Sequence, residues 1–149
     1  DAAGSLGSDD VILKGANALD LERKLAGISI GHPALGTSGP ILQAAIGRRV
    51  QLILPVGLEK RIPGNLAEIA ARINGPSASG TRLLPVSGII VTELEAITLL
   101  TGADAELVSA GGVLGAEGSC LIAVTGTEAQ LESASAIIDP IVNEPPFGK

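Results

Sequence analysis

The chain has 149 residues, a formal net charge of −6 and a hydrophobic content of 46%, yet Phe147 is its only aromatic residue. This length suits one compact domain, or a core domain with a small second one. The lack of a basic cluster and of stacking aromatic residues argues against nucleic acid as a partner. The apolar runs are strand-sized, far below the roughly 20 residues of a membrane-spanning helix, so we expect a cytoplasmic protein without membrane contact.

Three further features of the composition set expectations. Many aliphatic residues on a small chain predict apolar surface that another copy covers, so we expect a homo-oligomer. Cys120 is the only cysteine, which excludes an intrachain disulfide. Because the chain contains no methionine, we do not expect Asp1 to be the translational start.

The first half of the chain predicts alternating strands and helices. Short continuous apolar runs are typical of buried strands in a parallel sheet, and apolar residues three and four apart indicate helices. The predicted elements are strands at 11–13, 26–30 and 50–56 and helices at 41–46 and 66–73. Their order predicts an α/β fold with a Rossmann-like parallel sheet over residues 1–80.

Capping residues set the expected helix ends. Pro40 suits a first helical turn, which makes Ser38 or Gly39 the expected N-cap. Asn65 is the expected N-cap of the second helix, which should stop at Gly75.

The second half follows a linker-like stretch at 76–81 and has a different order of elements. A strand at 86–91 leads to a helix that begins with the capping box Thr92-x-x-Glu95 and stops at Gly102. Strands at 105–109 and 120–124 and a helix at 127–142 follow. This β-α-β-β-α order predicts a small ferredoxin-like α+β module over residues 85–149.

Two polar loops follow predicted strands of the first half, where open α/β sheets bind ligands. The second loop also leads into a helix, whose first N–H groups attract anions. The candidate ligand-binding residues are Lys14, Gly15, Asn17, His32, Gly36, Thr37, Ser38 and Gly39. They predict a site for a phosphate or carboxylate, although Thr37 and Ser38 equally suit helix capping, and His32 equally suits a structural hydrogen bond.

A second candidate site lies after the predicted central strand. Glu59 is a possible general acid, base or nucleophile, and Lys60 could pair with an anionic substrate. An ordinary solvated turn with a local ion pair explains the same residues, because charge runs in loops usually face water.

Other motifs are absent or have a simpler explanation. The Gly36-x-x-Gly39 loop lacks the Gly-Lys-Ser/Thr ending of a P-loop, and no G-x-G-x-x-G order follows a strand. The glycine-rich run at 111–118 reads as a hairpin tip. One histidine and one cysteine do not supply a zinc site, so no metal or other cofactor is expected, and Cys120 reads as a core residue.

The order of three segments, 11–20, Gly36-Thr37 and 51–56, resembles that of methylthioribose-1-phosphate isomerase and the regulatory subunits of translation initiation factor 2B. These belong to the sugar-phosphate isomerase (NagB/RpiA) and CoA-transferase superfamily, in which a strand leads into a Gly-Ala-Asp loop and a Gly-Thr pair opens a helix. The run from Gly57 to Pro63 is similar to a Gly-Ile-Glu-Lys-Ile-Val-Pro run of lactate-utilisation proteins in the same superfamily. The resemblance covers residues 10–75, and the pattern at 85–145 resembles microcompartment shell domains.

The resemblance implies that Gly15, Ala16, Asn17, Gly36 and Thr37 line a pocket for a phosphorylated sugar, nucleotide or related anion. Asn17 replaces the acidic residue of the isomerase loop, and an amide cannot accept a proton from a sugar carbon at neutral pH. Two hypotheses follow. The chain binds or transforms a small phosphorylated or carboxylated metabolite, or it is a structural or regulatory oligomer without catalysis.

Overall fold

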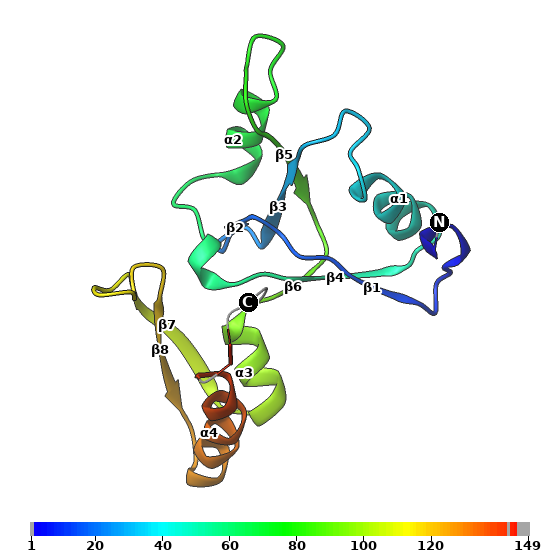
Figure 1. Ribbon diagram of the computed structural model, residues 1–149. Helices are drawn as coiled ribbons and strands as arrows, with labels where there is room; N and C mark the ends of the chain where they lie inside the picture. The colour runs from blue at the N-terminus through cyan, green and yellow to red at the C-terminus, as the bar shows by residue number, and fades with distance from the viewer. Residues whose placement is uncertain (1, 143, 146–149) are drawn as a thin grey trace. The chain divides into compact units, whose positions relative to one another are not determined.

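The computed structural model describes residues 2–142 and 144–145, so Phe147 lies outside the described part (Figure 1). The chain divides into two compact units, residues 1–91 and residues 92–149. The first unit contains a parallel and an antiparallel sheet, and the second contains a two-stranded antiparallel sheet with two helices. The protein is therefore a mixed α/β protein, as the sequence predicts. Within the described residues, no helix combines the length and apolar character needed to cross a bilayer.

The parallel sheet has the strand order β1-β4-β6. Its strands are β1 (Val11–Leu13), β4 (Gln51–Pro55) and β6 (Ile89–Val91). β4 is central, as its continuous apolar sequence predicts. Gly88 lets β6 approach β4 closely, because a Cβ atom at this position would lie 2.9 Å from the carbonyl oxygen of Leu52.

The second sheet of this unit is antiparallel and has the order β2-β3-β5. Its strands are β2 (Ala18–Asp20), β3 (Leu25–Ile30) and β5 (Arg82–Val86). β2 also meets the segment after β4, since Leu19 forms a parallel bridge with Arg61 and accepts a 2.8 Å hydrogen bond from the N–H of Ile62. The segments 11–20 and 51–62 therefore run side by side through both sheets.

Short helical segments complete the first unit. They are η1 (Ala2–Ser5), α1 (Ser38–Leu42), the π-helical η2 (Gln43–Gly47), η3 (Leu58–Lys60) and α2 (Leu66–Ile73). The guanidinium of Arg48 donates hydrogen bonds to the carbonyl oxygens of Ala3 and Leu6, which ties the end of η2 to the start of the chain. α2 packs its buried face, Leu66 and Ala70, against Ala18 and Leu83 of the antiparallel sheet.

A buried carboxylate joins α2 to β2. Asp20 is only 2% exposed, and its oxygens accept hydrogen bonds from the N–H groups of Arg23 at 3.0 Å and Leu66 at 3.1 Å. Burial raises the pKa of Asp20, but these two N–H groups and the Arg23 guanidinium more than offset it, so the pKa lies below its ordinary value. The side-chain oxygen of Asn65 accepts from the N–H of Ala67 at 3.0 Å. The first two N–H groups of α2 are therefore bonded to side-chain oxygens, Leu66 to Asp20 and Ala67 to Asn65.

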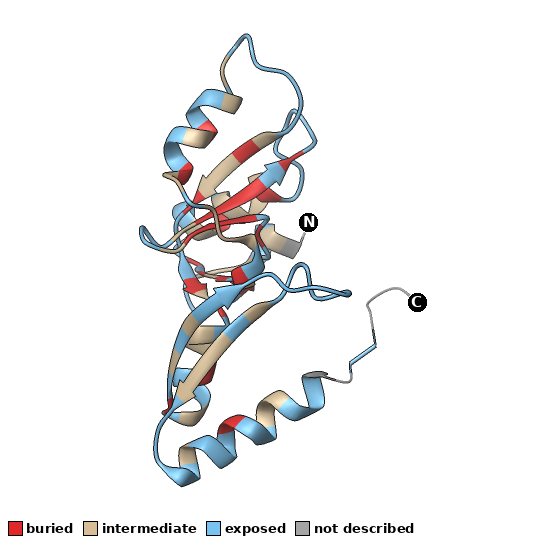
Figure 2. Ribbon diagram, turned by 90° about the vertical axis from the view of Figure 1, so that its left-hand side faces the viewer, coloured by how far each residue is buried: buried red, intermediate tan, exposed pale blue. Residues whose placement is uncertain are grey.

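The second unit comprises α3 (Glu93–Thr101), β7 (Asp104–Ala110), β8 (Cys120–Thr125) and α4 (Glu128–Val142). α3 opens with the predicted capping box of Thr92 and Glu95, and it ends at Gly102, whose φ of 72° is left-handed. The side chain of Gln130 links the helices, because it donates to the carbonyl of Gly102 and accepts from the N–H of Thr127. Figure 2 shows that buried residues are concentrated on the strands of the first unit, whereas the second unit is mainly exposed or intermediate.

Most predicted elements are confirmed within a residue or two, including the Asn65 cap and the hairpin tip between β7 and β8. Three details are wrong. Residues 18–20, which were expected in a loop, form β2 because they pair with β3. The strand at 26–30, which was expected in the parallel sheet, is β3 and pairs antiparallel with β2 and β5. The single strand expected at 86–91 is two strands, β5 and β6, which pair with β3 and β4. Both strands therefore belong to the first compact unit, which extends to Val91.

The capping residues of two helices can be compared with the prediction. α2 covers Leu66–Ile73 as expected, with Asn74 as its C-cap and the predicted stop residue Gly75 directly after it. Asn74 ends the helix because its side chain donates to the carbonyl of Leu83 at 2.7 Å and accepts from the N–H of Leu83 at 3.0 Å. The N-cap position of α1 is Thr37, one residue before the earlier of the two expected positions.

The buried Asp20 carboxylate generates the first prediction. Asp20→Asn should lower the free energy of unfolding by about 2 kcal/mol at pH 7, because an amide offers one acceptor where the carboxylate offers two, and its NH₂ group opposes the N–H of Leu66. Urea denaturation measures this difference. The exposed Asp9→Asn provides the matched control and should change the value by less than about 0.5 kcal/mol.

The same contact predicts a pH dependence. The folded-state pKa lies below the ordinary value of 3.8, so ionised Asp20 stabilises the fold above about pH 5. This contribution should disappear as the pH falls through the folded-state pKa. The stability difference between the wild type and Asp20→Asn should therefore shrink on the acid side, and a difference that is constant from pH 7 to pH 3 would contradict the assignment.

Candidate functional site

The carboxyl edge of the parallel sheet carries one group of candidate residues. Lys14 and Gly15 follow β1, and Glu59 and Lys60 lie in η3 after β4. Because β1 and β4 are parallel neighbours, both pairs lie at the same edge of the sheet. The Nζ atom of Lys14 donates to the carbonyl of Gly15 at 3.3 Å, so this ammonium group folds back on its own turn.

Glu59 and Lys60 form a local ion pair. Their nearest charged atoms are 3.8 Å apart, and the two side chains are 45% and 40% exposed. The Glu59 carboxylate folds back over Gly57 in the same turn. An exposed pair of this kind contributes little to stability. This geometry matches the solvated turn that the sequence left open, and a catalytic role for the pair stays a prediction.

Asn17 is part of a strand contact. Its side-chain oxygen accepts a hydrogen bond from the N–H of Ser29 at 2.9 Å, and its own N–H donates to the carbonyl of Gly27 at 2.8 Å. The residue thus extends the pairing of β2 with β3 by one step. The Asn17 amide therefore has a structural use within the sheet.

The loop between β3 and α1 forms a tight turn with internal hydrogen bonds. The Nδ1 atom of His32 accepts from the N–H of Ala34 at 3.1 Å, and Leu35 and Gly36 both have left-handed φ values of 64° and 55°. The N–H of Ser38 donates to the carbonyl of Leu35 at 3.1 Å, and the Ser38 residue is buried. One N–H group expected to face an anion is therefore already bonded.

The helix after this loop is a weak anion site. α1 has five residues before the chain continues as the π-helical η2, and its N-cap Thr37 makes no side-chain capping bond. A helix this short aligns few peptide dipoles. Gly39 is half-buried, so its N–H is only partly accessible to a ligand. The start of this short helix is therefore not enough to bind an anion at Gly36 to Gly39.

Both polar loops bond to the antiparallel sheet β2-β3-β5. The Asn17 turn bonds to Ser29 of β3, and the loop 31–39 follows β3, bonds within itself and accepts a 2.8 Å hydrogen bond at the carbonyl of Gly31 from Nη2 of Arg82. Their convergence on one ligand stays a prediction.

A small cavity does lie beside the second loop. Its volume is about 170 Å³, and it is lined by Ile30, Pro33, Leu35, Asn74, Arg82, Leu83 and Leu84. Arg82 starts β5 opposite Ile30 of β3, so the strand pairing places the guanidinium next to the loop. Both ends of the Asn74 amide are bonded to Leu83. The guanidinium is the one charged group among the lining residues.

Arg82 and Asn74 were not among the residues that the sequence singled out. Arg82 follows the linker-like stretch 76–81, and nothing local marks it as part of a site. Its role depends on the pairing of β5 with β3, between residues more than fifty positions apart. In the sequence, the only sign of a site here is that Arg82 is a single basic residue at the start of a strand.

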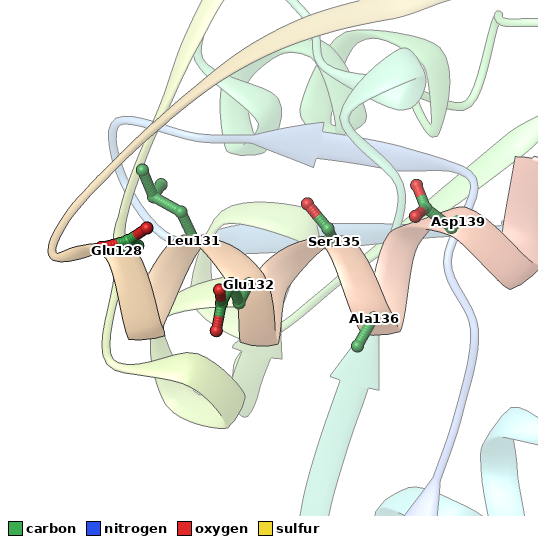
Figure 3. Close-up of a pocket in the computed structure, with 6 residues that line it drawn as sticks. All are labelled: Glu128, Leu131, Glu132, Ser135, Ala136 and Asp139. Carbon is green, nitrogen blue, oxygen red and sulfur yellow. The ribbon is translucent and has the colours of Figure 1, made fainter.

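The second unit has two hollows of different character. A groove of about 410 Å³ lies among α3, β8 and α4, and its lining is Glu93, Ala96, Ile97, Leu100, Cys120, Ile122, Val124, Ile137, Ile138 and Ile141. Cys120 lines this apolar groove and is half-buried, so it is not the fully buried core residue that the sequence suggested. A wider hollow of about 670 Å³ is lined only by α4, where Figure 3 shows Glu128, Glu132 and Asp139 with Leu131, Ser135 and Ala136. Carboxylates spread along one exposed helix face do not by themselves make a site.

No metal centre is formed by the described residues: no three of their His, Cys, Asp or Glu side chains come together. Comparison with protein-family models, curated proteins and solved structures gives no significant match to the chain.

The contact of Asn17 generates a prediction that separates structure from ligand binding. Asn17→Ala should lower the free energy of unfolding by about 1 kcal/mol, because the N–H of Ser29 loses its acceptor. Asn17→Asp keeps an acceptor at the same place and should restore most of this loss. Urea denaturation of both variants is the measurement, and equal stability of Asn17→Ala and the wild type would show that the bond to Ser29 contributes nothing.

Proposed function

We propose that the first unit binds a small carboxylated metabolite and that Arg82 receives its carboxylate. The observation that carries this proposal is the cavity beside the loop 31–39, which is lined by Arg82 together with mainly aliphatic residues. Small-molecule sites generally combine apolar walls with a few placed polar groups.

The chemistry of the lining favours one carboxylate. A guanidinium has five N–H donors in a planar fork that matches the two oxygens of a carboxylate. One Arg82 donor bonds to the carbonyl of Gly31, which holds the group in place and leaves further donors for a ligand. The Asn74 amide is committed to Leu83. A phosphate dianion would need a second cation or several N–H groups, and the lining residues provide no second cation.

The size of the cavity limits the ligand. About 170 Å³ is below the 300–1,000 Å³ of most ligand sites. It suits a short-chain monocarboxylate, with the chain against Pro33 and Leu35 and the carboxylate on Arg82. A sugar phosphate or nucleotide is too large to be enclosed here.

Backbone strain in the adjacent loop supports a binding site at the same cavity. Leu35 has a left-handed φ of 64°, a conformation that costs a non-glycine residue roughly 1–2 kcal/mol. Such strain is concentrated at binding and catalytic sites. The strained residue is itself part of the cavity wall, so a ligand that contacts Leu35 would help to hold the turn.

The proposal assigns binding and no catalytic step, since Glu59 and Lys60 are not among the residues that line this cavity. A relationship to the sugar-phosphate isomerase and CoA-transferase superfamily also remains a proposal. The parallel sheet β1-β4-β6 supports the Rossmann-like description. The second unit has the order α3-β7-β8-α4 and lacks the first strand of the predicted β-α-β-β-α pattern, because β6 pairs with β4 of the first unit, so a ferredoxin-like module remains a proposal. A cytoplasmic location remains a prediction of the same kind.

A thermal-shift series tests the binding proposal. Acetate, propionate, pyruvate and lactate should raise the melting temperature of the wild type, because a ligand that binds only the folded state stabilises it by mass action. Inorganic phosphate and ribose 5-phosphate should have a smaller effect at the same concentration and ionic strength. A larger shift with the phosphates would favour the polar loops over Arg82.

The matched variants are Arg82→Gln and Arg72→Gln, which remove the same charge. Arg72 is exposed on α2 and does not line the cavity. Arg82→Gln should reduce carboxylate affinity at least tenfold, whereas Arg72→Gln should leave it unchanged. If no carboxylate shifts the wild type, or if both variants respond equally, Arg82 is not the binding group.

A further inference from the structure

The end of α2 carries a pair of residues with a chemistry of its own. Asn74 is followed directly by Gly75. In such a pair the backbone nitrogen of the glycine can attack the side-chain amide carbon of the asparagine, because the glycine has no side chain to obstruct the approach. The other asparagines, Asn17, Asn65 and Asn143, are followed by alanine, leucine and glutamate.

The reaction is a deamidation in two steps. The nitrogen of Gly75 forms a bond to Cγ of Asn74 and loses its proton, and the bond from Cγ to Nδ2 breaks. Ammonia leaves, and a five-membered succinimide ring remains. Water then opens the ring at either carbonyl carbon, which gives an aspartate or an isoaspartate, in which the main chain runs through Cβ. The two steps consume one water molecule and release one ammonia molecule.

Hydrogen bonds in the fold hold both reacting groups away from this reaction. The Nδ2 atom of Asn74 donates to the carbonyl of Leu83 at 2.7 Å, and its Oδ1 atom accepts from the N–H of Leu83 at 3.0 Å. The N–H of Gly75 donates to the carbonyl of Arg72 at 3.3 Å. Since Asn74 is exposed, these contacts protect it and burial does not.

The backbone of Asn74 also has the wrong conformation for ring closure. A nearly flat five-membered ring needs the nitrogen of Gly75 to eclipse Cβ of Asn74 about the bond from Cα to C. The ψ angle of Asn74 is −2°, so the Gly75 nitrogen eclipses the Asn74 nitrogen instead. Ring closure requires a large rotation about this bond, which would break the hydrogen bond from Gly75 to Arg72.

We propose that Asn74 is a site of spontaneous deamidation that the folded chain suppresses and that reacts when Asn74 separates from Leu83. The residues 76–81 that join α2 to β5 are all exposed, so no packed segment closes over this junction (Figure 1). The modification therefore marks chains in which the end of α2 has separated from β5.

The product is disfavoured by the fold. A carboxylate has no N–H to donate to the carbonyl of Leu83 and places a negative charge against that oxygen. It also lies at the C-terminal end of α2, where the helix dipole disfavours a negative charge. Once formed, the product should keep the junction from closing as before.

The product also changes the candidate binding cavity. Asn74 and Arg82 both line it, so a carboxylate at position 74 would compete with a bound carboxylate for the guanidinium. This consequence rests on the proposed function, whereas the modification itself does not.

Peptide mapping of the full chain by mass spectrometry tests the proposal, because deamidation replaces NH₂ by OH and chromatography separates aspartate from isoaspartate. The chain is incubated at one mildly alkaline pH with and without denaturing urea. Asn74 should react at least tenfold faster in urea than in the folded chain. In urea, Asn17 and Asn65 are the internal controls and should react at least tenfold more slowly than Asn74.

Gly75→Ala is the matched variant, since its Cβ atom obstructs the attacking nitrogen. It should slow the reaction of Asn74 in urea at least tenfold, and this measurement does not require the variant to fold. Equal rates for folded and unfolded wild type overturn protection by the fold. A rate in urea that matches that of Asn17, or that Gly75→Ala leaves unchanged, overturns the site itself.

Asn74→Asp mimics one product, and Asn65→Asp makes the same chemical change at the other end of α2. Asn74→Asp should lower the melting temperature by several degrees. Asn65→Asp should not, because aspartate is a good N-cap and still accepts from the N–H of Ala67. Equal melting temperatures of Asn74→Asp and the wild type would refute the destabilising effect of the product.

Carboxylate binding is measured separately by thermal shift. Asn74→Asp should lose at least tenfold in affinity where the wild type binds, and unchanged affinity would refute the effect on the cavity. A wild type that binds no carboxylate refutes the proposed function and leaves the deamidation result intact.

Discussion

The first unit depends on one buried charge, the carboxylate of Asp20. It lies where β2 ends and receives N–H groups from the following turn and from the start of α2, 46 residues further along the chain. An uncompensated carboxylate at this depth would be very costly, so α2 can take only the position that delivers the N–H of Leu66 to it. The position of α2 then fixes the aliphatic cluster of Ala18, Leu66, Ala70 and Leu83. A polar contact thus specifies an arrangement that apolar packing stabilises.

The same arrangement places the candidate binding cavity. Asn74 ends α2 by bonding both ways to Leu83, and this aligns β5 beside β3. Arg82 then lies opposite Ile30 and bonds to the carbonyl of Gly31, at the base of the strained turn that contains Leu35. The proposed site is a consequence of how α2 and β5 are anchored, and it needs no helix dipole from the short α1.

The sequence by itself determined the local structure well. Apolar runs marked β1, β3, β4 and β8, and the Asn65 cap and the Thr92–Glu95 capping box marked the starts of α2 and α3, because such signals act over a few residues. It wrongly placed the strand at 26–30 in the parallel sheet, since β3 pairs antiparallel with β2 and β5.

Only the tertiary structure decided which strands pair and which polar groups are already used. β2 is three residues long and has no periodicity to reveal it, and Ser87-Gly88 divides one apolar run between two sheets. The amide of Asn17 and the N–H of Ser38 look available in the sequence but are bonded in the fold. The physical reason is that strand pairing and hydrogen-bond satisfaction are long-range conditions, which residue type and spacing alone do not fix.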